Sequence, residues 1–145
     1  LEHSEPFESE VLRLTNSARA RGWDCRQKRC GVGPVLPALV LHPQLTQAAL
    51  AQSSAMALHD FVAHVSPVDG SRPIDRVTAT QFAPLSVGEN LAGGSRTPAE
   101  VVDGWLRSPG HCKNIMGDFN LIGLAMTYRA DTTYKYYWTQ VFGKF

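Results

Sequence analysis

The segment T-P-A-E-V-V-D-G-W-L-R-S-P-G-H-C-K-N-I-M, Thr97 to Met116, contains two successive helix starts. Thr97 and Glu100 form the T-x-x-E pattern of a capping box, and a proline occupies the first helical turn. The apolar face of this helix consists of Val101, Val102, Trp105 and Leu106. Ser108-Pro109 repeats the cap-plus-proline signal. The segment therefore predicts a helix followed at once by a short helical turn that carries His111 to Met116.

Further helices are predicted on the N-terminal side of this segment. Residues 6–20 place Phe7, Val11, Leu14 and Ala18 on one face of an amphipathic helix. Pro43 suits the first turn of a second helix. Its predicted inner stripe is Leu45, Ala48, Ala49, Ala55, Met56 and Phe61. A short helix is expected over residues 73–80.

Strands are predicted mainly in the C-terminal part of the chain. S-V-G-E-N-L-A-G-G, Ser86 to Gly94, reads as a short strand closed by paired glycines. Residues 121–129 and 134–142 alternate apolar side chains and flank a turn at Ala130–Thr133. Helices therefore precede an antiparallel hairpin, which predicts an α+β layered fold.

Length and composition limit the class of protein. The 145 residues correspond to about one domain, so we expect a single domain over 1–145. The chain begins at Leu1, as expected after signal-peptide removal, and L-E-H is typical of a cloning scar. Residues 1–5 are accordingly expected to be scar or disordered. No stretch approaches the roughly 20 apolar residues of a membrane span.

Charge gives no indication of a nucleic-acid or membrane partner. The formal net charge is only +1, so no global field steers the protein to a polyanion. Basic residues do cluster after the first helix, and we interpret the cluster as a solvated helix end and loop. The cluster consists of Arg19, Arg21, Arg26, Lys28 and Arg29.

Two histidines and one glutamate are the candidate functional residues. The other histidines, which we assign structural or surface roles, are His3, His42 and His59. His64 and His111 each lie beside a tight turn outside a helix, where functional groups concentrate. Glu89 lies in a strand that reads as buried, so its carboxylate needs a charged partner, a set of donors or a metal. The trio suits a His₂Glu metal site; three independent structural residues are the alternative.

Other catalytic patterns are absent from the sequence. It contains no G-x-S-x-G elbow, no P-loop and no G-x-G-x-x-G. Cys112 follows His111 directly, but adjacent side chains on a helix diverge by about 100°, so a Cys–His nucleophile pair does not follow. With three cysteines, at most one intramolecular disulfide can form, and we favour a structural disulfide for Cys112.

Four motifs in a fixed order carry a family resemblance. They are F-V-A-H-V-S-P-V-D-G, V-G-E-N-L-A, E-V-V-D-G-W-L-R-S-P-G-H-C-K-N-I-M and Y-W-T-Q-V-F-G. From about residue 8 to its C-terminus the chain resembles the CAP superfamily (cysteine-rich secretory proteins, antigen 5 and pathogenesis-related 1 proteins), most closely its secreted bacterial SCP-like branch. The resemblance implies a three-layer α-β-α sandwich with a central antiparallel sheet.

The resemblance also implies a cleft in which two histidines and two glutamates hold a divalent cation. The matching residues here are His64, His111 and Glu89. The second glutamate is replaced by Ser108, as in bacterial relatives, so we expect a weakly bound cation, with Zn²⁺ preferred over Mg²⁺ or Ca²⁺. The residues expected to orient the ligands are Ser108, Asn90 and Gln140. If the cleft is catalytic, Glu89 is the expected catalytic residue.

For the cysteines and the function, the resemblance implies the following. Cys112 pairs with Cys25, or alternatively with Cys30. The protein is secreted or resides in the cell envelope. It acts as a monomeric module that binds a ligand or extracellular partner, without established catalysis and without nucleic acid. The alternatives are a metal-dependent, peptidase-like hydrolase and a lipid- or sterol-binding protein.

Overall fold

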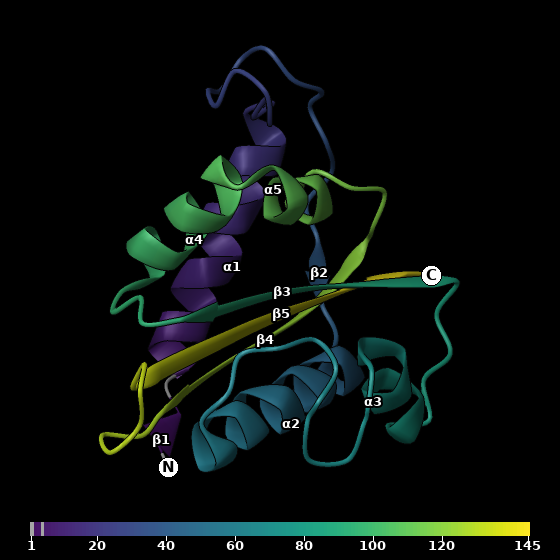
Figure 1. Ribbon diagram of the computed structural model, residues 1–145. Coiled ribbons are helices and arrows are strands. Elements are labelled where there is room, and N and C mark those ends of the chain that lie inside the picture. Colours follow the sequence, from purple (N-terminus) through teal and green to yellow (C-terminus); the bar gives the residue numbers. More distant parts are fainter. Residues whose placement is uncertain (1, 4) are drawn as a thin grey trace.

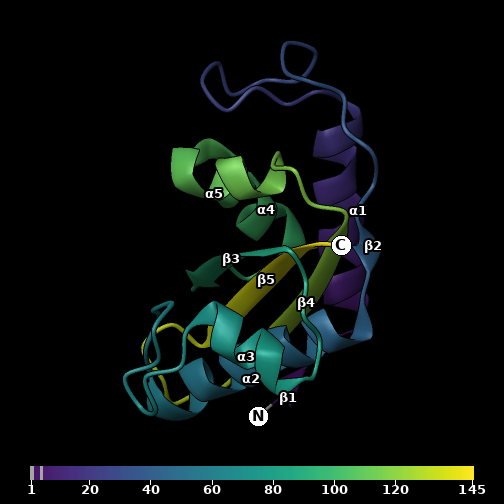
Figure 2. The same ribbon diagram turned by 90° about the vertical axis from the view of Figure 1, so that its right-hand side faces the viewer.

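The computed structural model describes residues 2–3 and 5–145. The helices are α1 (Glu5–Ala20), α2 (Pro43–His59), α3 (Pro73–Ala79), α4 (Pro98–Arg107) and α5 (Pro109–Ile115). The strands are β1 (Glu2–His3), β2 (Val40–Leu41), β3 (Ser86–Gly93), β4 (Leu121–Tyr128) and β5 (Tyr136–Lys144). The sheet lies between two helical layers, with α1, α4 and α5 on one side and α2 and α3 on the other (Figure 1; Figure 2).

The sheet has the strand order β1-β4-β5-β3, so β3 forms one edge. β4 and β5 form an antiparallel hairpin, and β3 pairs antiparallel with β5 so that Asn90 lies opposite Gln140. β2 pairs with β4 in parallel because the chain returns from α1 along the outer edge of β4. The predicted α+β sandwich is confirmed, with one parallel pair in a sheet that was expected to be antiparallel throughout.

Each face of the sheet contributes to a different hydrophobic core. Trp138 and Phe142 of β5 pack on α1, α4 and α5, whereas Val141 packs on α2. The N-terminus of α2 lies directly on the sheet at Gly123, where a Cβ would come 2.0 Å from the Leu45 carbonyl carbon. The sheet therefore separates the two helical layers, and its edge strand β3 lies between those layers.

Local differences from the sequence prediction have physical causes. β5 begins at Tyr136 rather than at residue 134, because Lys135 adopts a left-handed φ of 69° and the Tyr136 N–H bonds back to the Tyr134 carbonyl. In the predicted stripe of α2, Ala55 is only half-buried and Phe61 lies beyond the helix. Residues Glu2–His3 of the N-terminal segment pair with β4. Leu1 and Ser4 lie outside the described residues.

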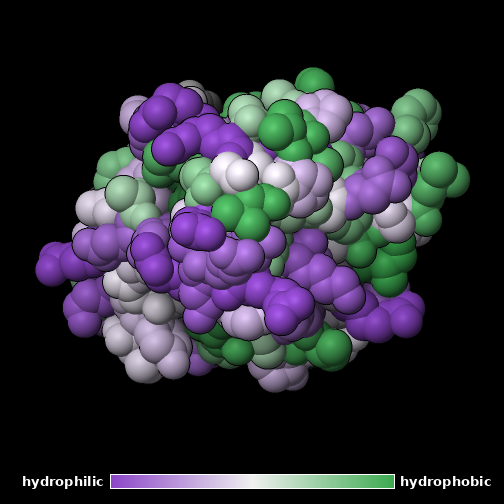
Figure 3. Space-filling model, turned by 90° about the horizontal axis from the view of Figure 1, so that it is seen from above, coloured by the Kyte–Doolittle hydropathy of each residue, from purple (hydrophilic) through white to green (hydrophobic). Residues whose placement is uncertain are grey.

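Arg19 does not belong to the solvated basic cluster that the sequence predicted. It is 2% exposed and donates to the carbonyls of four residues, Pro37, Ile115, Gly117 and Phe119. It thereby ties the end of α1 to the end of α5. The other cations of the cluster are exposed, and the view onto this end of the molecule shows a band of hydrophilic side chains (Figure 3). Among the helices of the described residues, none combines the length and apolarity needed to cross a membrane.

Candidate functional site

Glu89 forms the floor of the candidate site. It lies in the edge strand β3, and its side chain is 1% exposed. One carboxylate oxygen lies 2.9 Å from His64 Nδ1, and the other accepts a 2.9 Å hydrogen bond from Arg76 Nη2. A buried carboxylate requires such partners. Of the three possibilities that the sequence left open for Glu89, namely a charged partner, a set of donors or a metal, the structure shows a charged partner, Arg76.

Arg76 comes from α3 and is itself buried, with 8% of its side chain exposed. Besides Glu89, its guanidinium donates to the carbonyls of His64 and Ser71, each at 2.8 Å. These bonds attach both ends of the loop between α2 and α3 to the sheet edge. Arg76 therefore positions His64 as well as neutralising Glu89.

The His64 imidazole is fixed by its contact with Glu89. Its side chain is 55% exposed. The hydrogen bond to Glu89 raises the pKa of His64 above its ordinary value of 6.5, while partial burial opposes the shift. Because Nδ1 faces the carboxylate, Nε2 is the nitrogen left for a ligand.

His111 belongs to the opposite helical layer, in α5. Its Nδ1 lies 2.9 Å from Ser108 Oγ. The Ser108 side chain, which the sequence predicted to cap this helix, makes no cap hydrogen bond because its hydroxyl contacts His111 instead. Burial lowers the pKa of His111, and the positive charge of nearby His64 lowers it further. The two imidazoles are thus electrostatically coupled.

A buried amide network supports the backbone around His111. Asn90 donates to the His111 carbonyl and to Gln140, each at 3.1 Å. Asn114 donates to the Glu89 carbonyl at 3.1 Å and to the Asn90 side-chain oxygen at 2.9 Å. Gln140 continues the network to Thr15 of α1. Asn90 and Gln140 therefore act on α5 and its attachment to β3, not on an imidazole directly.

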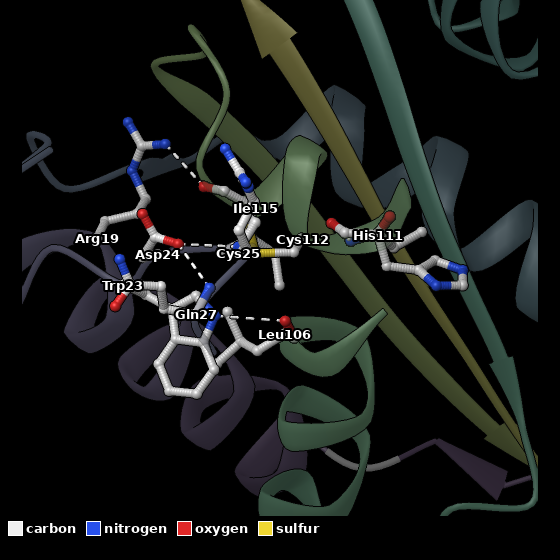
Figure 4. The surroundings of a disulfide bond; sticks show 11 residues. Arg19, Trp23, Asp24, Cys25, Gln27, Leu106, His111, Cys112 and Ile115 are labelled. Atoms are coloured by element: carbon white, nitrogen blue, oxygen red, sulfur yellow. Dashed lines mark hydrogen bonds between the residues drawn. A yellow bond between two sulfur atoms is a disulfide. The ribbon is translucent and has the colours of Figure 1, made fainter. Parts of the chain in front are cut away.

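The disulfide joins Cys25 to Cys112, with a Cα–Cα distance of 5.8 Å, and Cys30 is a free thiol. The resemblance left two partners open for Cys112, and in the structure the partner is Cys25. The bond attaches α5 to the loop after α1. Figure 4 shows the His111 ring pointing away from the disulfide, so the two neighbouring residues face different parts of the molecule.

A groove of about 370 Å³ is lined by Ser108, His111 and the end of β3. Apolar residues from both layers line it: Val62, Leu91, Val101, Trp105 and Tyr134. Larger hollows of about 540 and 620 Å³ lie elsewhere and include none of the three predicted residues. The structure therefore brings His64 to Glu89 and places His111 in the lining of a groove that His64 and Glu89 do not line.

The donor set does not fit a three-ligand cation site as it stands. Among residues 2–3 and 5–145, no group of three or more His, Cys, Asp and Glu side chains is arranged to hold a metal. Glu89 contacts His64 Nδ1, the position of a carboxylate that orients a histidine rather than that of a ligand. The positively charged guanidinium of Arg76 also pairs with this carboxylate, in the place where a cation would bind. The cation remains a prediction that rests on the two Nε2 atoms.

Arg76 and Trp105 are the site residues that sequence reasoning missed. A charged partner was one of three possibilities for the buried carboxylate of Glu89. The sequence did not indicate which arginine supplies it, because the contact spans 13 residues and depends on the placement of α3. Trp105 was assigned only to the apolar face of its helix. Its indole N–H donates to the Leu91 carbonyl at 3.0 Å and so connects α4 to the edge of β3.

Comparisons with known proteins agree with this architecture. The family model described as CAP, cysteine-rich secretory protein family, matches residues 12–142. The chain is 34% identical over 137 residues to the uncharacterized protein YkwD of Bacillus subtilis (strain 168), covering 94% of this chain and 46% of that protein. It therefore spans less than half the length of this relative.

Solved structures give the same result. A crystal structure of an extracellular protein containing an SCP domain from Bacillus anthracis (strain Ames) matches with a TM-score of 0.76 and 26% identity, covering 97% of this chain and 41% of that one. An outer surface protein from Borrelia burgdorferi matches with a TM-score of 0.69 and 22% identity, covering 99% and 97%. The second likeness concerns the fold alone.

Proposed function

The chain belongs to the cysteine-rich secretory protein (CAP) family, and from this premise we propose that its cleft binds an extracytoplasmic ligand or partner without catalysing a reaction on it. The observation that carries the proposal is that both imidazoles are held in place, and that one of them, His111, lines the groove. His64 is held through Nδ1 by Glu89, and His111 contacts Ser108 through Nδ1. Each ring keeps Nε2 for a ligand, and a preorganised site of this kind loses little entropy on binding.

The extracytoplasmic setting has separate support. The Cys25–Cys112 disulfide suits an oxidising compartment. One of the matched proteins, the SCP-domain protein from Bacillus anthracis, is described as extracellular. By analogy we propose that this domain is secreted or held in the cell envelope, and that it works there as a monomer.

The geometry is less suited to a metal-dependent hydrolase. Such an enzyme would use Glu89 to activate water, but that side chain is 1% exposed and bonds to His64 and Arg76. The hydrolase alternative predicts cleavage of a peptide library that disappears in Glu89→Gln. We expect no cleavage by the wild-type protein under conditions in which ligand binding is measurable.

A weakly bound cation remains part of the proposal. His64 and His111 would supply Nε2 atoms, with Glu89 orienting the first ring. Calorimetry of metal-stripped protein with Zn²⁺, Mg²⁺ and Ca²⁺ tests it. We expect weak Zn²⁺ binding that His64→Ala and His111→Ala each abolish; no binding, or binding unchanged in both variants, would remove the cation from the function.

Saturation-transfer NMR tests the binding function itself. The probes are N-acetylglucosamine, a capped Leu-Ala dipeptide and decanoate, which represent saccharide, peptide and lipid ligands. We expect at least one class to give a transfer signal that is lost in His64→Ala and in His111→Ala. His59→Ala, an exposed histidine at the end of α2, is the matched control. If no signal depends on either cleft histidine, the proposal fails.

A further inference from the structure

Gly104 is a glycine that the fold itself does not require. It lies inside α4, where glycine costs about 1 kcal/mol relative to alanine. Its φ is not left-handed, and a Cβ built on it meets nothing within 4 Å. Gly93, by contrast, is needed, because a Cβ there would lie 2.7 Å from the Tyr134 ring. Since Gly104 lines the groove, the open space above it is suited to a bound group.

The main chain of β3 offers hydrogen-bonding groups in the same place. The Gly94 N–H donates to the Tyr136 carbonyl, and the β3–β5 register then turns the even-numbered residues of β3 toward β5. The odd-numbered residues face the open edge. The outward carbonyls of Glu89 and Leu91 accept bonds from Asn114 and Trp105. No hydrogen bond among the described residues uses the Leu91 N–H or either outward group of Gly93.

The walls on either side of this edge are apolar and come from both layers. Val62 and Tyr134 lie over Gly93 from the layer of α2 and the hairpin loop. Val101 and Trp105 contribute from α4. A slot with free main-chain donors along its floor and apolar side walls has the chemistry of β-strand addition, in which backbone bonds give affinity and side-chain pockets give specificity.

We propose that the groove accepts an extended peptide segment. The peptide runs along the outer edge of β3, bonds to the main chain of Leu91 and Gly93, and places an apolar side chain over Gly104. This inference rests on the proposed function, because His111 lines the groove. An alkyl chain would fill the same walls but would leave the Leu91 and Gly93 groups unbonded, so the main-chain groups favour a peptide.

Amide chemical shifts of the ¹⁵N-labelled protein test the proposal. The probes are capped pentapeptides of sequence Thr-Val-Xaa-Val-Thr, with leucine, phenylalanine or glycine at the centre. We expect the first two to shift the amides of Leu91 and Gly93, and the glycine peptide to bind about tenfold more weakly. N-methylation of the peptide backbone should abolish the shifts. If no probe shifts these amides at millimolar concentration, or if decanoate shifts them and the peptides do not, the proposal is wrong.

Gly104→Leu separates binding from folding. The leucine side chain points into open space and is a better helix former than glycine, so we expect an unchanged or raised melting temperature together with at least tenfold weaker peptide binding. Gly110→Ala is the matched control, since its Cβ also meets nothing within 4 Å but lies outside the groove lining. Equal binding by both variants would overturn the slot. Shifts confined to His64 and His111 would also overturn it, while leaving the cleft proposal intact.

Discussion

The two histidines of the proposed cleft are held by different kinds of contact. On the side of His111, a disulfide joins Cys112 to Cys25, and buried amides support the backbone. His64 lies in the loop between α2 and α3. There Arg76 donates to the His64 carbonyl, and the side-chain amide of Gln52 donates to the Ala63 carbonyl. The first anchor is covalent and uncharged, whereas the second depends on a buried ion pair. The comparison indicates that a buried charge pair anchors mainly the His64 side of the site.

Removing the disulfide should have the largest effect on stability. The bond closes a sequence separation of 87 residues, and the chain-entropy model assigns such a loop about 4 to 5 kcal/mol. We therefore expect Cys25→Ala/Cys112→Ala to lose about that much unfolding free energy by urea denaturation. Amide exchange should increase in α5 more than in the loop that carries His64.

Cys30→Ala is the control for the disulfide variant. Its thiol is free and half-buried, so the change in unfolding free energy should stay within about 0.5 kcal/mol. Equal acceleration of exchange on both sides of the cleft would contradict the assignment of the disulfide to the His111 side.

Removing Arg76 should come next and should act on the other side. Arg76→Met leaves the Glu89 carboxylate buried without its cation, and breaking a buried pair in this way costs about 3 to 5 kcal/mol. The double variant Arg76→Met/Glu89→Gln removes the buried charge as well and should recover part of the loss. Urea midpoints of the three proteins measure both effects.

The exposed pair of Arg72 and Asp75 provides the matched control. We expect no measurable shift of the urea midpoint in Arg72→Met, since solvent-exposed pairs contribute little. If Arg76→Met also leaves the urea midpoint unchanged, the ion pair does not anchor the His64 loop, and the contrast between the two sides fails.

The same contrast explains what could be predicted from sequence. Thr97 accepts a hydrogen bond from the Glu100 N–H, as the capping pattern predicted, because a cap depends on neighbouring residues. The hairpin strands were also predictable, since their alternation is local. The start of β5 after the hairpin turn was not predicted, because Lys135 adopts a left-handed conformation that no local preference indicated.

The site divides in a similar way. His64 and His111 were identified from their position beside turns, Glu89 from its place in a strand that reads as buried, and all three from the family motifs. The side chains that contact these three residues and set their chemistry were not predicted, because these contacts form only when α3 and α5 pack on β3. Arg76 therefore escaped prediction, and Ser108 was assigned to a helix cap although its hydroxyl bonds to His111.

The smallest predicted effect is the order in which the imidazoles titrate. The Glu89 hydrogen bond raises the pKa of His64 above 6.5, and burial lowers the pKa of His111 below 6.5. On acidification His64 should therefore protonate first. Its contribution to stability is present below pH 6.5 and is lost as the pH rises through its folded pKa, whereas His111 costs stability as the pH falls below 6.5. Side-chain NMR titration measures both midpoints. Glu89→Gln should lower the midpoint of His64, and His64→Ala should raise that of His111, because a neighbouring positive charge is removed. A His111 midpoint above that of His64 would show that Glu89 does not set the protonation of His64. The contrast between the two sides of the site would then fail.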